Sequence, residues 1–252
     1  MDIKGCVAIV TGANRGIGEG FVRVLIEEGA AKVYAGARDP ASARHLEDEF
    51  PGRVVAVQLD VSKPDQITAA AAACPDVSVV VNNAGAFTNR LLMGADDLSG
   101  AREEMEVNYF GPLAMARAFA PALKANGGGA ILNVLSVGGI VAVPNMGGYS
   151  PSKFAMRAAG SCIRAELAGQ GTSVTSLIVG SVDTRMASHV KGSKEQPEDI
   201  ARAAMKGITR GVDEIDTDRF AIESRAALAR DPKGMERGMA RMLHAQELST
   251  GR

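Results

Sequence analysis

The sequence predicts an α/β fold in which a doubly wound parallel sheet carries helices on both faces. Short runs rich in valine and isoleucine alternate with stretches whose apolar residues have helical spacing, which is typical of strand–helix–strand units. Several short runs are apolar at consecutive positions, as expected for parallel strands buried on both faces. The predicted strands are Val7–Val10, Lys32–Gly36, Val54–Gln58, Val77–Val81, Ala130–Leu135 and Val174–Val179.

Apolar stripes between these runs predict the helices. Phe21, Leu25 and Ile26 form a stripe after the first strand, and a longer helical region lies between Met105 and Leu123. A third stripe consists of Met156, Ala159, Ile163 and Leu167. Parallel strands joined by helices connect through right-handed crossovers, so we expect a doubly wound sheet.

The signals are weaker after residue 179. Residues 186–196 are polar and charged and predict a loop, whereas Pro197 with two following acidic residues predicts the start of a helix. The stretch 211–218 is acidic, which argues against a buried strand. Helical spacing returns near the C-terminus, where we expect apolar side chains to pack in the core or at a subunit interface: Met235, Met239, Met242 and Leu243.

Size and composition are those of one globular domain over residues 1–252, with 46% hydrophobic and 23% charged residues. The net charge of −1 provides no basic field for nucleic acid or an anionic membrane. The apolar stretch from Cys6 to Val10 is too short for a signal-peptide core or a membrane span. We therefore expect a cytoplasmic protein that binds neither nucleic acid nor membrane.

Cysteine and histidine give no sign of a metal site. The three cysteines are scattered and odd in number, which also argues against a disulfide framework. The three histidines, His45, His189 and His244, lie far apart without ligand spacing. The predicted metal content is therefore none.

A glycine-rich turn follows the first predicted strand, with Gly12, Gly16 and Gly18 directly before the first helix. Glycine permits a tight turn and lets backbone N–H groups approach a pyrophosphate, whose charge the helix N-terminus favours. The spacing GxxxGxG differs from the GxGxxG fingerprint, and Glu19 stands where a P-loop would carry lysine. A purely structural turn is the alternative, but its place between a strand and a helix favours a dinucleotide site.

The end of the second strand bears on the choice between NAD and NADP. A carboxylate there usually binds the ribose 2′-hydroxyl of NAD, whereas arginine accommodates a 2′-phosphate. Asp39 is followed by Pro40, which favours an N-cap and a first helical position. Arg38 is then free, and Arg15 approaches from the glycine turn, so the two arginines favour NADP(H), with NAD(H) possible. Two solvated surface arginines are the alternative.

Polar residues also follow the third and fourth strands. Asp60 is placed to accept a hydrogen bond from an adenine amino group, and its alternative role is capping. Ser62, with Asp65 three residues later, already resembles a helix start. The small residues and amides at 82–85 would let the chain pass close to a cofactor ribose, although a structural turn explains them almost equally well.

Ser136, Tyr149 and Lys153 form a candidate catalytic group. Tyr149 and Lys153 share a helix face if the helix begins near Tyr149, and Pro151 suits its first turn. A lysine at about 4 Å would favour the phenolate by about 4 kcal/mol at an effective dielectric of about 20, which brings the phenol pKa from about 10 toward neutrality. Ser136 can hydrogen-bond the same substrate oxygen. It has no histidine placed to make it a nucleophile, and a turn at the strand end is its other role.

Taken together, these motifs resemble the short-chain dehydrogenase/reductase family. The resemblance runs from the first strand to about Thr184 and rests on TGxxxGIG from Thr11, NNAG from Asn82, Asn108, Ser136 and YSPSK from Tyr149. It implies a Rossmann-like sheet of about seven strands and a homodimer or homotetramer built on the two long central helices. Four small residues suit close helix packing there: Ala155, Ala158, Ala159 and Gly160.

The resemblance also implies residue roles. Tyr149 would be the general acid/base, Ser136 would orient the substrate carbonyl, and Lys153 would lower the phenol pKa and bind the nicotinamide ribose. Asn108 would hold a water of a proton relay behind Lys153. The cofactor site would comprise Tyr149, Lys153 and a further set: Gly12, Asn14, Arg15, Gly16, Ile17, Gly18, Arg38, Asp60, Val61, Asn83, Ala84, Gly85, Gly180, Val182 and Thr184.

Two departures from the family pattern stand out. Members usually carry Pro-Gly after the sixth strand, whereas this chain has Val179-Gly180; the Val182 backbone and the Thr184 hydroxyl still match the positions that hold the carboxamide. The acidic 211–218 stretch makes the expected last strand doubtful.

The function predicted from the sequence is hydride transfer between NADP(H) and a carbonyl or secondary alcohol. A non-catalytic NADP-binding sensor is the alternative, but it has no need of all four catalytic residues. Enoyl reduction and halohydrin dehalogenation fit the tyrosine–lysine spacing and Lys153 less well.

The sequence suggests an apolar small-molecule substrate. The side chains that suggest it are equally compatible with loop packing: Leu91, Met93, Val143, Met146 and Met186. Three cations leave a charged substrate open: Arg90, Arg185 and Lys191.

Overall fold

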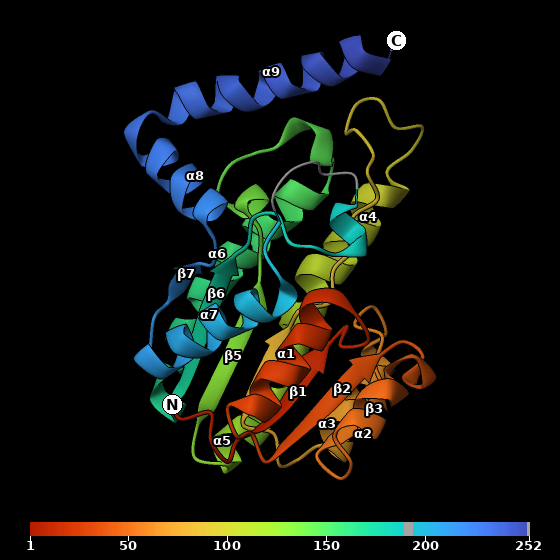
Figure 1. The fold of residues 1–252 in the computed structure, drawn as a ribbon, viewed down its shortest axis with the longest axis vertical. Coiled ribbons are helices and arrows are strands. Elements are labelled where there is room, and N and C mark those ends of the chain that lie inside the picture. The colour runs from red at the N-terminus through yellow and green to blue at the C-terminus, as the bar shows by residue number, and fades with distance from the viewer. Residues whose placement is uncertain (189–193, 251–252) are drawn as a thin grey trace.

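The structure, a computed structural model, describes residues 1–188 and 194–250. Its centre is a parallel sheet of seven strands in the order β3-β2-β1-β4-β5-β6-β7 (Figure 1). The strands are β1 Val7–Thr11, β2 Lys32–Ala37, β3 Val54–Gln58, β4 Val79–Asn82, β5 Gly129–Val134, β6 Thr172–Ile178 and β7 Glu214–Asp216. All six strands predicted from the sequence are confirmed, with ends that differ by two residues at most.

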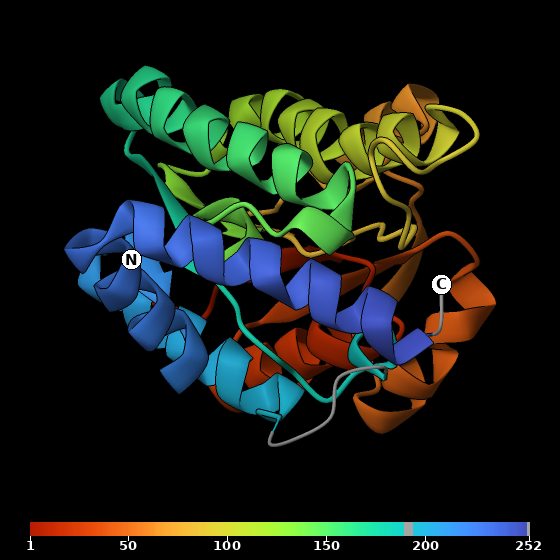
Figure 2. The same ribbon diagram turned by 90° about the horizontal axis from the view of Figure 1, so that it is seen from above.

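Helices cover both faces of the sheet, as Figure 2 shows from above. The helices are α1 Gly16–Glu27, α2 Arg44–Glu49, α3 Pro64–Ala73, α4 Ser99–Met105, α5 Gly111–Ala125, α6 Tyr149–Leu167, α7 Pro197–Arg210, α8 Arg219–Arg230 and α9 Pro232–Thr250. A π-helical turn, Glu106–Phe110, joins α4 to α5, and short 3-10 turns include Pro40–Ala43, Val137–Gly139, Pro144–Met146 and Arg185–Ala187. The doubly wound fold is thus confirmed, with strand order reversing between β1 and β4.

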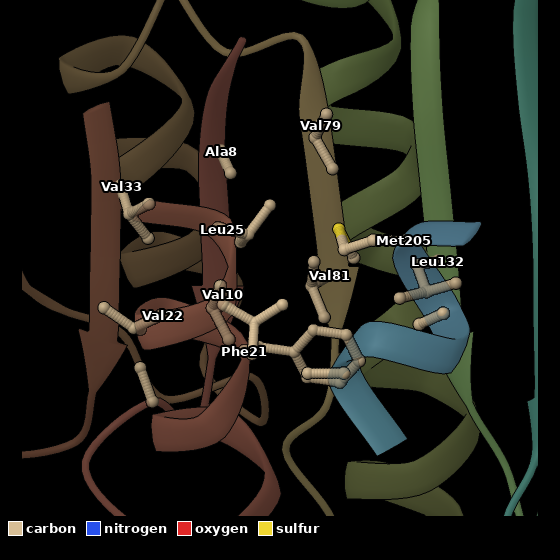
Figure 3. Packing of buried hydrophobic residues seen from close by; sticks show 14 of the residues in the cluster. Ala8, Val10, Phe21, Val22, Leu25, Val33, Val79, Val81, Leu132 and Met205 are labelled. Carbon is tan, nitrogen blue, oxygen red and sulfur yellow. The ribbon is translucent and has the colours of Figure 1, made fainter. Parts of the chain in front are cut away.

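The core lies in two layers, one on each face of the sheet. Figure 3 shows one layer, where Phe21 and Leu25 of α1 and Met205 of α7 pack against strand residues that include Val10 and Val81. Successive strand residues point to opposite faces, so the neighbouring Ile9 and Val80 belong to the second layer, with α3, α5 and α6. The central strands are apolar at consecutive positions because both faces are buried.

β7 corrects the expectation from the acidic 211–218 stretch. Glu214–Asp216 pairs in parallel with β6 as a short edge strand. Arg157 of α6 donates to both oxygens of Glu214, at 2.7 and 3.0 Å, and Arg225 of α8 does the same for Asp216, at 2.6 and 2.8 Å. The strand forms because arginines distant in sequence neutralise its carboxylates.

The C-terminal helices extend from β7 over one end of the sheet. In Figures 1 and 2, α9 reaches across the carboxyl ends of the strands. The predicted helix is confirmed, and Met239, with partly buried Met235, packs against the second core layer. No described helix is both long and apolar enough to cross a membrane.

Candidate active site

Most of the predicted site residues lie at the carboxyl ends of β1, β4, β5 and β6, while Arg38 follows β2 and Asp60 and Val61 follow β3. Ligands bind at this edge of a parallel sheet, where the strand order reverses. The structure therefore brings together segments more than 100 residues apart in sequence, from the glycine turn to Thr184. For example, a Cβ built on Gly16 would lie 3.2 Å from Cγ2 of Thr184.

The glycine turn has the backbone that a pyrophosphate needs. Gly12 and Gly16 have φ of +63° and +58°, a region that favours glycine. A Cβ at Gly18 would overlap the carbonyl oxygen of Gly12, so a side chain there would fill the turn. No side chain caps α1, since its N-cap residue Arg15 makes no such hydrogen bond, which leaves the first backbone N–H groups for an anion. On these observations the turn fits a dinucleotide.

A hydrogen-bond network ties this turn to the end of β4. The Asn83 amide donates to the Thr11 and Gly12 carbonyls at 2.9 and 3.2 Å. Thr11 Oγ1 accepts from the backbone N–H of Asn83 and of Ala84, each at 3.0 Å. Asn83 and Ala84 are thus held beside the glycine turn, and Thr11 does this from a buried position. Sequence reasoning used Thr11 only as part of a motif.

The residues predicted to favour NADP over NAD lie in the glycine turn and directly after β2. Asp39 accepts from the N–H of Ala41 at 3.0 Å as the N-cap of Pro40–Ala43, so its predicted capping role is confirmed. Arg15 and Arg38 are exposed, and the described residues include no ion-pair partner for either. Both guanidiniums are consequently available to a phosphate.

Of the two roles considered for Asp60, the structure shows only the local one. Its Oδ1 accepts from both the N–H and the Oγ of Ser62, at 2.9 and 2.7 Å, which forms a local turn beside buried Val61. The expectation that Ser62 caps the next helix is wrong, because Lys63 is the N-cap of α3 and Ser62 donates its hydroxyl to Asp60. The contact of Asp60 with an adenine stays a prediction.

The tyrosine, the lysine and the serine come together at the start of α6. The helix begins at Tyr149, as predicted, and Ser136 follows β5 as the N-cap of the next short turn. Lys153 Nζ lies 5.5 Å from the Tyr149 ring centroid and donates to the Val134 carbonyl at 2.9 Å. Ser136 hydrogen-bonds the Tyr149 phenol.

The electrostatics of this group differ from the expectation of a near-neutral phenol. Burial raises the pKa of Tyr149 to about 12, against the opposing hydrogen bond from Ser136. Burial also lowers the pKa of Lys153 to about 8. Lys153 donates to a carbonyl, so the protein alone does not lower the phenol pKa, and the phenol keeps its proton at neutral pH.

Asn108 lies in the π-helical turn and is almost completely buried. Its Oδ1 accepts from the Ala86 N–H at 2.8 Å, and its Nδ2 donates to the Ala86 carbonyl and to Ser152 Oγ, at 2.9 and 3.0 Å. A Cβ at Gly85 would lie 3.4 Å from Asn108 Oδ1 and 3.8 Å from Lys153 Nζ. Asn108 thus joins the end of β4 to α6 next to Lys153, and its water-holding role stays a prediction.

The loop after β6 is held by a residue that sequence reasoning did not single out. Asp218 accepts from the Gly180 N–H at 2.6 Å and caps α8 by accepting from the Ala221 N–H at 2.9 Å. Val182 is buried and pairs with Glu195 in an isolated bridge. The departure at Val179-Gly180 therefore leaves an anchored loop. An aspartate directly before the α8 pattern was the signal available for its capping role.

The candidate substrate side is lined less tightly. Met146 lies close to the Ser136 turn, since a Cβ at Gly138 would be 3.5 Å from its sulfur, and Val143 packs on the second core layer. Leu91 and Met186 are half exposed, and Met93 is 96% exposed. Of the three cations, Arg90 pairs with Asp97 at 3.5 Å and Arg185 is exposed. Lys191 lies outside the described residues, as does His189.

The family follows from comparison with known proteins. A family model described as short chain dehydrogenase matches residues 6–195. The chain belongs to the short-chain dehydrogenase/reductase family. It is accordingly an oxidoreductase with a nicotinamide-cofactor site, and its predicted membership is confirmed. Among the described residues, no group of three histidine, cysteine or acidic side chains is arranged to hold a metal ion.

Individual members of the family resemble most of the chain. A short chain dehydrogenase of Burkholderia cenocepacia, solved in complex with NADP, is 42% identical with a TM-score of 0.89, covering 95% of this chain and 99% of that one. Dehydrogenase/reductase SDR family member 7B of Danio rerio is 30% identical over 82% of this chain and 75% of its own length. The 3-alpha-(or 20-beta)-hydroxysteroid dehydrogenase of Mycobacterium tuberculosis is 33% identical over 80% and 76%.

Proposed function

We propose that this short-chain dehydrogenase/reductase transfers a hydride between NADP(H) and an apolar ketone or the corresponding secondary alcohol. The observation that carries the proposal is the grouping of Ser136, Tyr149 and Lys153 next to the uncapped glycine turn. A sensor would need the turn but not the half-buried, hydrogen-bonded phenol and serine.

The preference for NADP(H) rests on charge. Arg15 in the glycine turn and Arg38 after β2 are exposed, and the Asp39 carboxylate accepts a hydrogen bond from the Ala41 N–H as an N-cap. Two guanidiniums suit a phosphate dianion, whereas NAD binding usually uses a free carboxylate at the second strand. The Burkholderia cenocepacia relative was solved with NADP, which supports the same preference.

Tyr149 handles the proton in this scheme. The reduced nicotinamide, when bound, supplies a hydride to the carbonyl carbon. Tyr149 donates its phenolic proton to the carbonyl oxygen, and Ser136 donates a hydrogen bond to that oxygen and orients it. In alcohol oxidation the phenolate takes the proton back. Lys153 binds the ribose hydroxyls, and Asn108 holds a relay water behind it.

The substrate class follows from the residues around the phenol. Met146 and Val143 lie on the turn that leads from Ser136 to α6, and the loop at 91–93 exposes apolar side chains toward solvent. These side chains favour an apolar ketone over a phosphorylated substrate. The hydroxysteroid dehydrogenase relative is compatible with a cyclic ketone.

NADPH consumption over a panel of aliphatic, aromatic and cyclic ketones tests the proposal. Tyr149→Phe is measured in parallel, with Tyr109→Phe as the matched control because Tyr109 packs against Phe110 in the π-helical turn. We expect wild type and Tyr109→Phe to reduce a subset of the ketones, and Tyr149→Phe to bind NADPH without turnover. Turnover by Tyr149→Phe would contradict the mechanism, and NADPH binding without turnover by any protein would favour the sensor.

We also propose that the enzyme is a homodimer or homotetramer. Phe110 and Phe154 are 49% and 38% exposed on the π-helical turn and on α6. Of the four small residues of α6, Gly160 faces its own sheet, since a Cβ there would lie 3.1 Å from Ser176 Oγ, and Ala158 is exposed. Sedimentation of wild type and of a Phe110→Asp, Phe154→Asp double variant measures the assembly; a monomeric wild type would contradict it.

A further inference from the structure

Glu104 of α4 is a buried carboxylate with an unusual set of contacts. Its side chain is only 1% exposed. Oε1 accepts from the N–H and the Oγ1 of Thr88, at 2.7 and 3.0 Å. Oε2 is buried and has no hydrogen-bond partner among the described residues. A buried carboxylate oxygen without a partner is costly, so its position calls for an explanation.

The unpartnered oxygen lies against the backbone that leads into Tyr149. A Cβ built on Gly148 would come within 2.8 Å of Glu104 Oε2 and 2.7 Å of the Ala101 Cα, so glycine allows the backbone at 148 to approach both. The small cavity that Glu104 and Gly148 share has a volume of about 10 Å³. Such a space is at the lower limit for one water and excludes a side chain or a substrate group.

The nearest cation is directed elsewhere. Arg90 lines the same cavity, but its guanidinium donates to Ser99 Oγ at 3.0 Å and pairs with Asp97 at 3.5 Å. No described basic side chain forms an ion pair with Glu104. Its charge is therefore little compensated where it meets the start of α6, and a charge in such surroundings acts over several Å.

We propose that Glu104 is a positioning residue with two separable effects, which rest on the proposed function. Through Thr88 it fixes the loop that leads to the substrate side. Through its unpartnered oxygen behind Gly148 it favours the protonated form of the Tyr149 phenol, which is the form that donates a proton in ketone reduction.

The groups that face Tyr149 support the second effect. They are Ser136, which hydrogen-bonds the phenol, Lys153, whose Nζ is held by the Val134 carbonyl, Glu104, and the ring of Phe87 at 5.4 Å. Glu104 is the one carboxylate among them. Burial has the largest effect and raises the pKa of Tyr149, the hydrogen bond with Ser136 lowers it, and the negative charge of Glu104 raises it by a smaller amount. The carboxylate thus adds to the effect of burial in favouring the neutral phenol.

Two variants separate the effects. Glu104→Gln keeps an oxygen for Thr88 and removes the charge, whereas Thr88→Val removes the hydroxyl contact and keeps the charge. The measurement is the pH profile of alcohol oxidation with NADP⁺, whose acid limb reports protonation of the general base in the free enzyme form. We expect Glu104→Gln to move this limb to lower pH by about 1 unit, which is the effect of a unit charge about 12 Å away at an effective dielectric of about 20.

Thr88→Val should leave the limb in place and raise the KM for the alcohol by about fivefold, the usual effect of one lost hydrogen bond. Glu104→Met, which has similar volume and no charge, is the second variant if Glu104→Gln does not fold, and it should shift the limb in the same direction. A limb that coincides with wild type in a folded, charge-free variant would overturn the electrostatic effect. An unchanged KM in Thr88→Val would overturn the loop effect.

A second readout separates this proposal from the proposed function. The chain has no tryptophan and three tyrosines, so tyrosinate absorbance can be followed with NADP⁺ bound, and subtraction of Tyr149→Phe isolates one phenol. Glu104→Gln should ionise this phenol at lower pH than wild type, even if no tested alcohol is a substrate. Identical titrations would overturn the inference, whereas a shifted titration with no turnover would count against the proposed function alone.

Discussion

On the cofactor side of the candidate site, between β1 and β4, side chains are held by hydrogen bonds to backbone atoms, as Asn83 and Thr11 show. On the substrate side, the loops after β4 and β6 expose apolar side chains such as Leu91, Met93 and Met186. The cofactor has the same shape in every reaction, so the first side can be built to fit it. The second side leaves exposed surface for a substrate whose shape the cofactor does not determine. Tyr149 and Lys153 lie at the boundary between them.

The largest effect should come from filling the glycine turn. In Gly18→Ala the new Cβ would overlap the Gly12 carbonyl oxygen, a backbone atom that cannot move without opening the turn. We expect NADPH affinity to fall about 100-fold, from overpacking of about 3 kcal/mol, measured by calorimetric titration. Gly169→Ala is the matched control, because a Cβ there meets no atom within 4 Å. Equal affinity in both variants would mean that the turn is not the phosphate site.

At the boundary, Lys153 should make stability depend on pH. Burial lowers its pKa from 10.5 to about 8, so between these values the unfolded chain binds more protons than the folded one, and stability rises with pH. Tyr149 acts in the opposite sense above pH 10, because burial raises its pKa. We expect the free energy of unfolding without cofactor to rise by up to about 3 kcal/mol from pH 7 to 10 and then to fall.

Urea unfolding at several pH values measures this dependence. Lys153→Met has no titrating group at that position and should lose the rise. The same rise in Lys153→Met would assign it to other groups.

A smaller effect is expected from the two arginines at the far end of the cofactor side. Removing both in an Arg15→Ala, Arg38→Ala variant should raise the KM for NADPH by about 30-fold, since charge-assisted hydrogen bonds to a phosphate are lost. The KM for NADH should stay within about twofold. Arg44→Ala, an exposed arginine beyond the same strand, serves as the control. A parallel loss for NADPH and NADH would show that neither arginine reads the 2′-phosphate.

The smallest effects should come from the substrate side. Met93 is 96% exposed, and Met93→Ser should change kcat/KM by less than about twofold for every ketone. Met146 lies by the Ser136 turn, so Met146→Ala should alter the ranking of bulky against small ketones by about tenfold. If Met93→Ser changes the ranking more, the loop at 91–93 closes over the bound substrate.

Much of the cofactor side was predictable from sequence because its signals are local. Consecutive valines identify buried strands. Glycines at 12, 16 and 18 identify a turn in which a larger residue would be strained or would clash. The strand β7 was expected only from the family resemblance, because its acidic residues give no local strand signal and are neutralised by Arg157 and Arg225 in two helices.

The role of Glu104 was hidden for a related reason. Helix α4 and its continuation carry three glutamates within four positions, at 103, 104 and 106, and only the packed fold shows which one is buried. The pKa of Tyr149 also depended on the fold, because Lys153 Nζ is engaged by the Val134 carbonyl. A spacing of four residues in a helix predicts that two side chains are close. It does not predict which group each of them hydrogen-bonds.

The contact between Gly180 and Asp218 bears on how this enzyme can be recombined with its relatives. A Cβ at residue 180 would overlap the Asp218 carboxylate, and the same carboxylate starts α8. Chimeric enzymes that take their C-terminal helices from another member must therefore exchange both positions together or keep both. A crossover placed anywhere between residues 180 and 218 would take the two residues from different parents. The segment from residue 180 to residue 218 should therefore be exchanged as one piece.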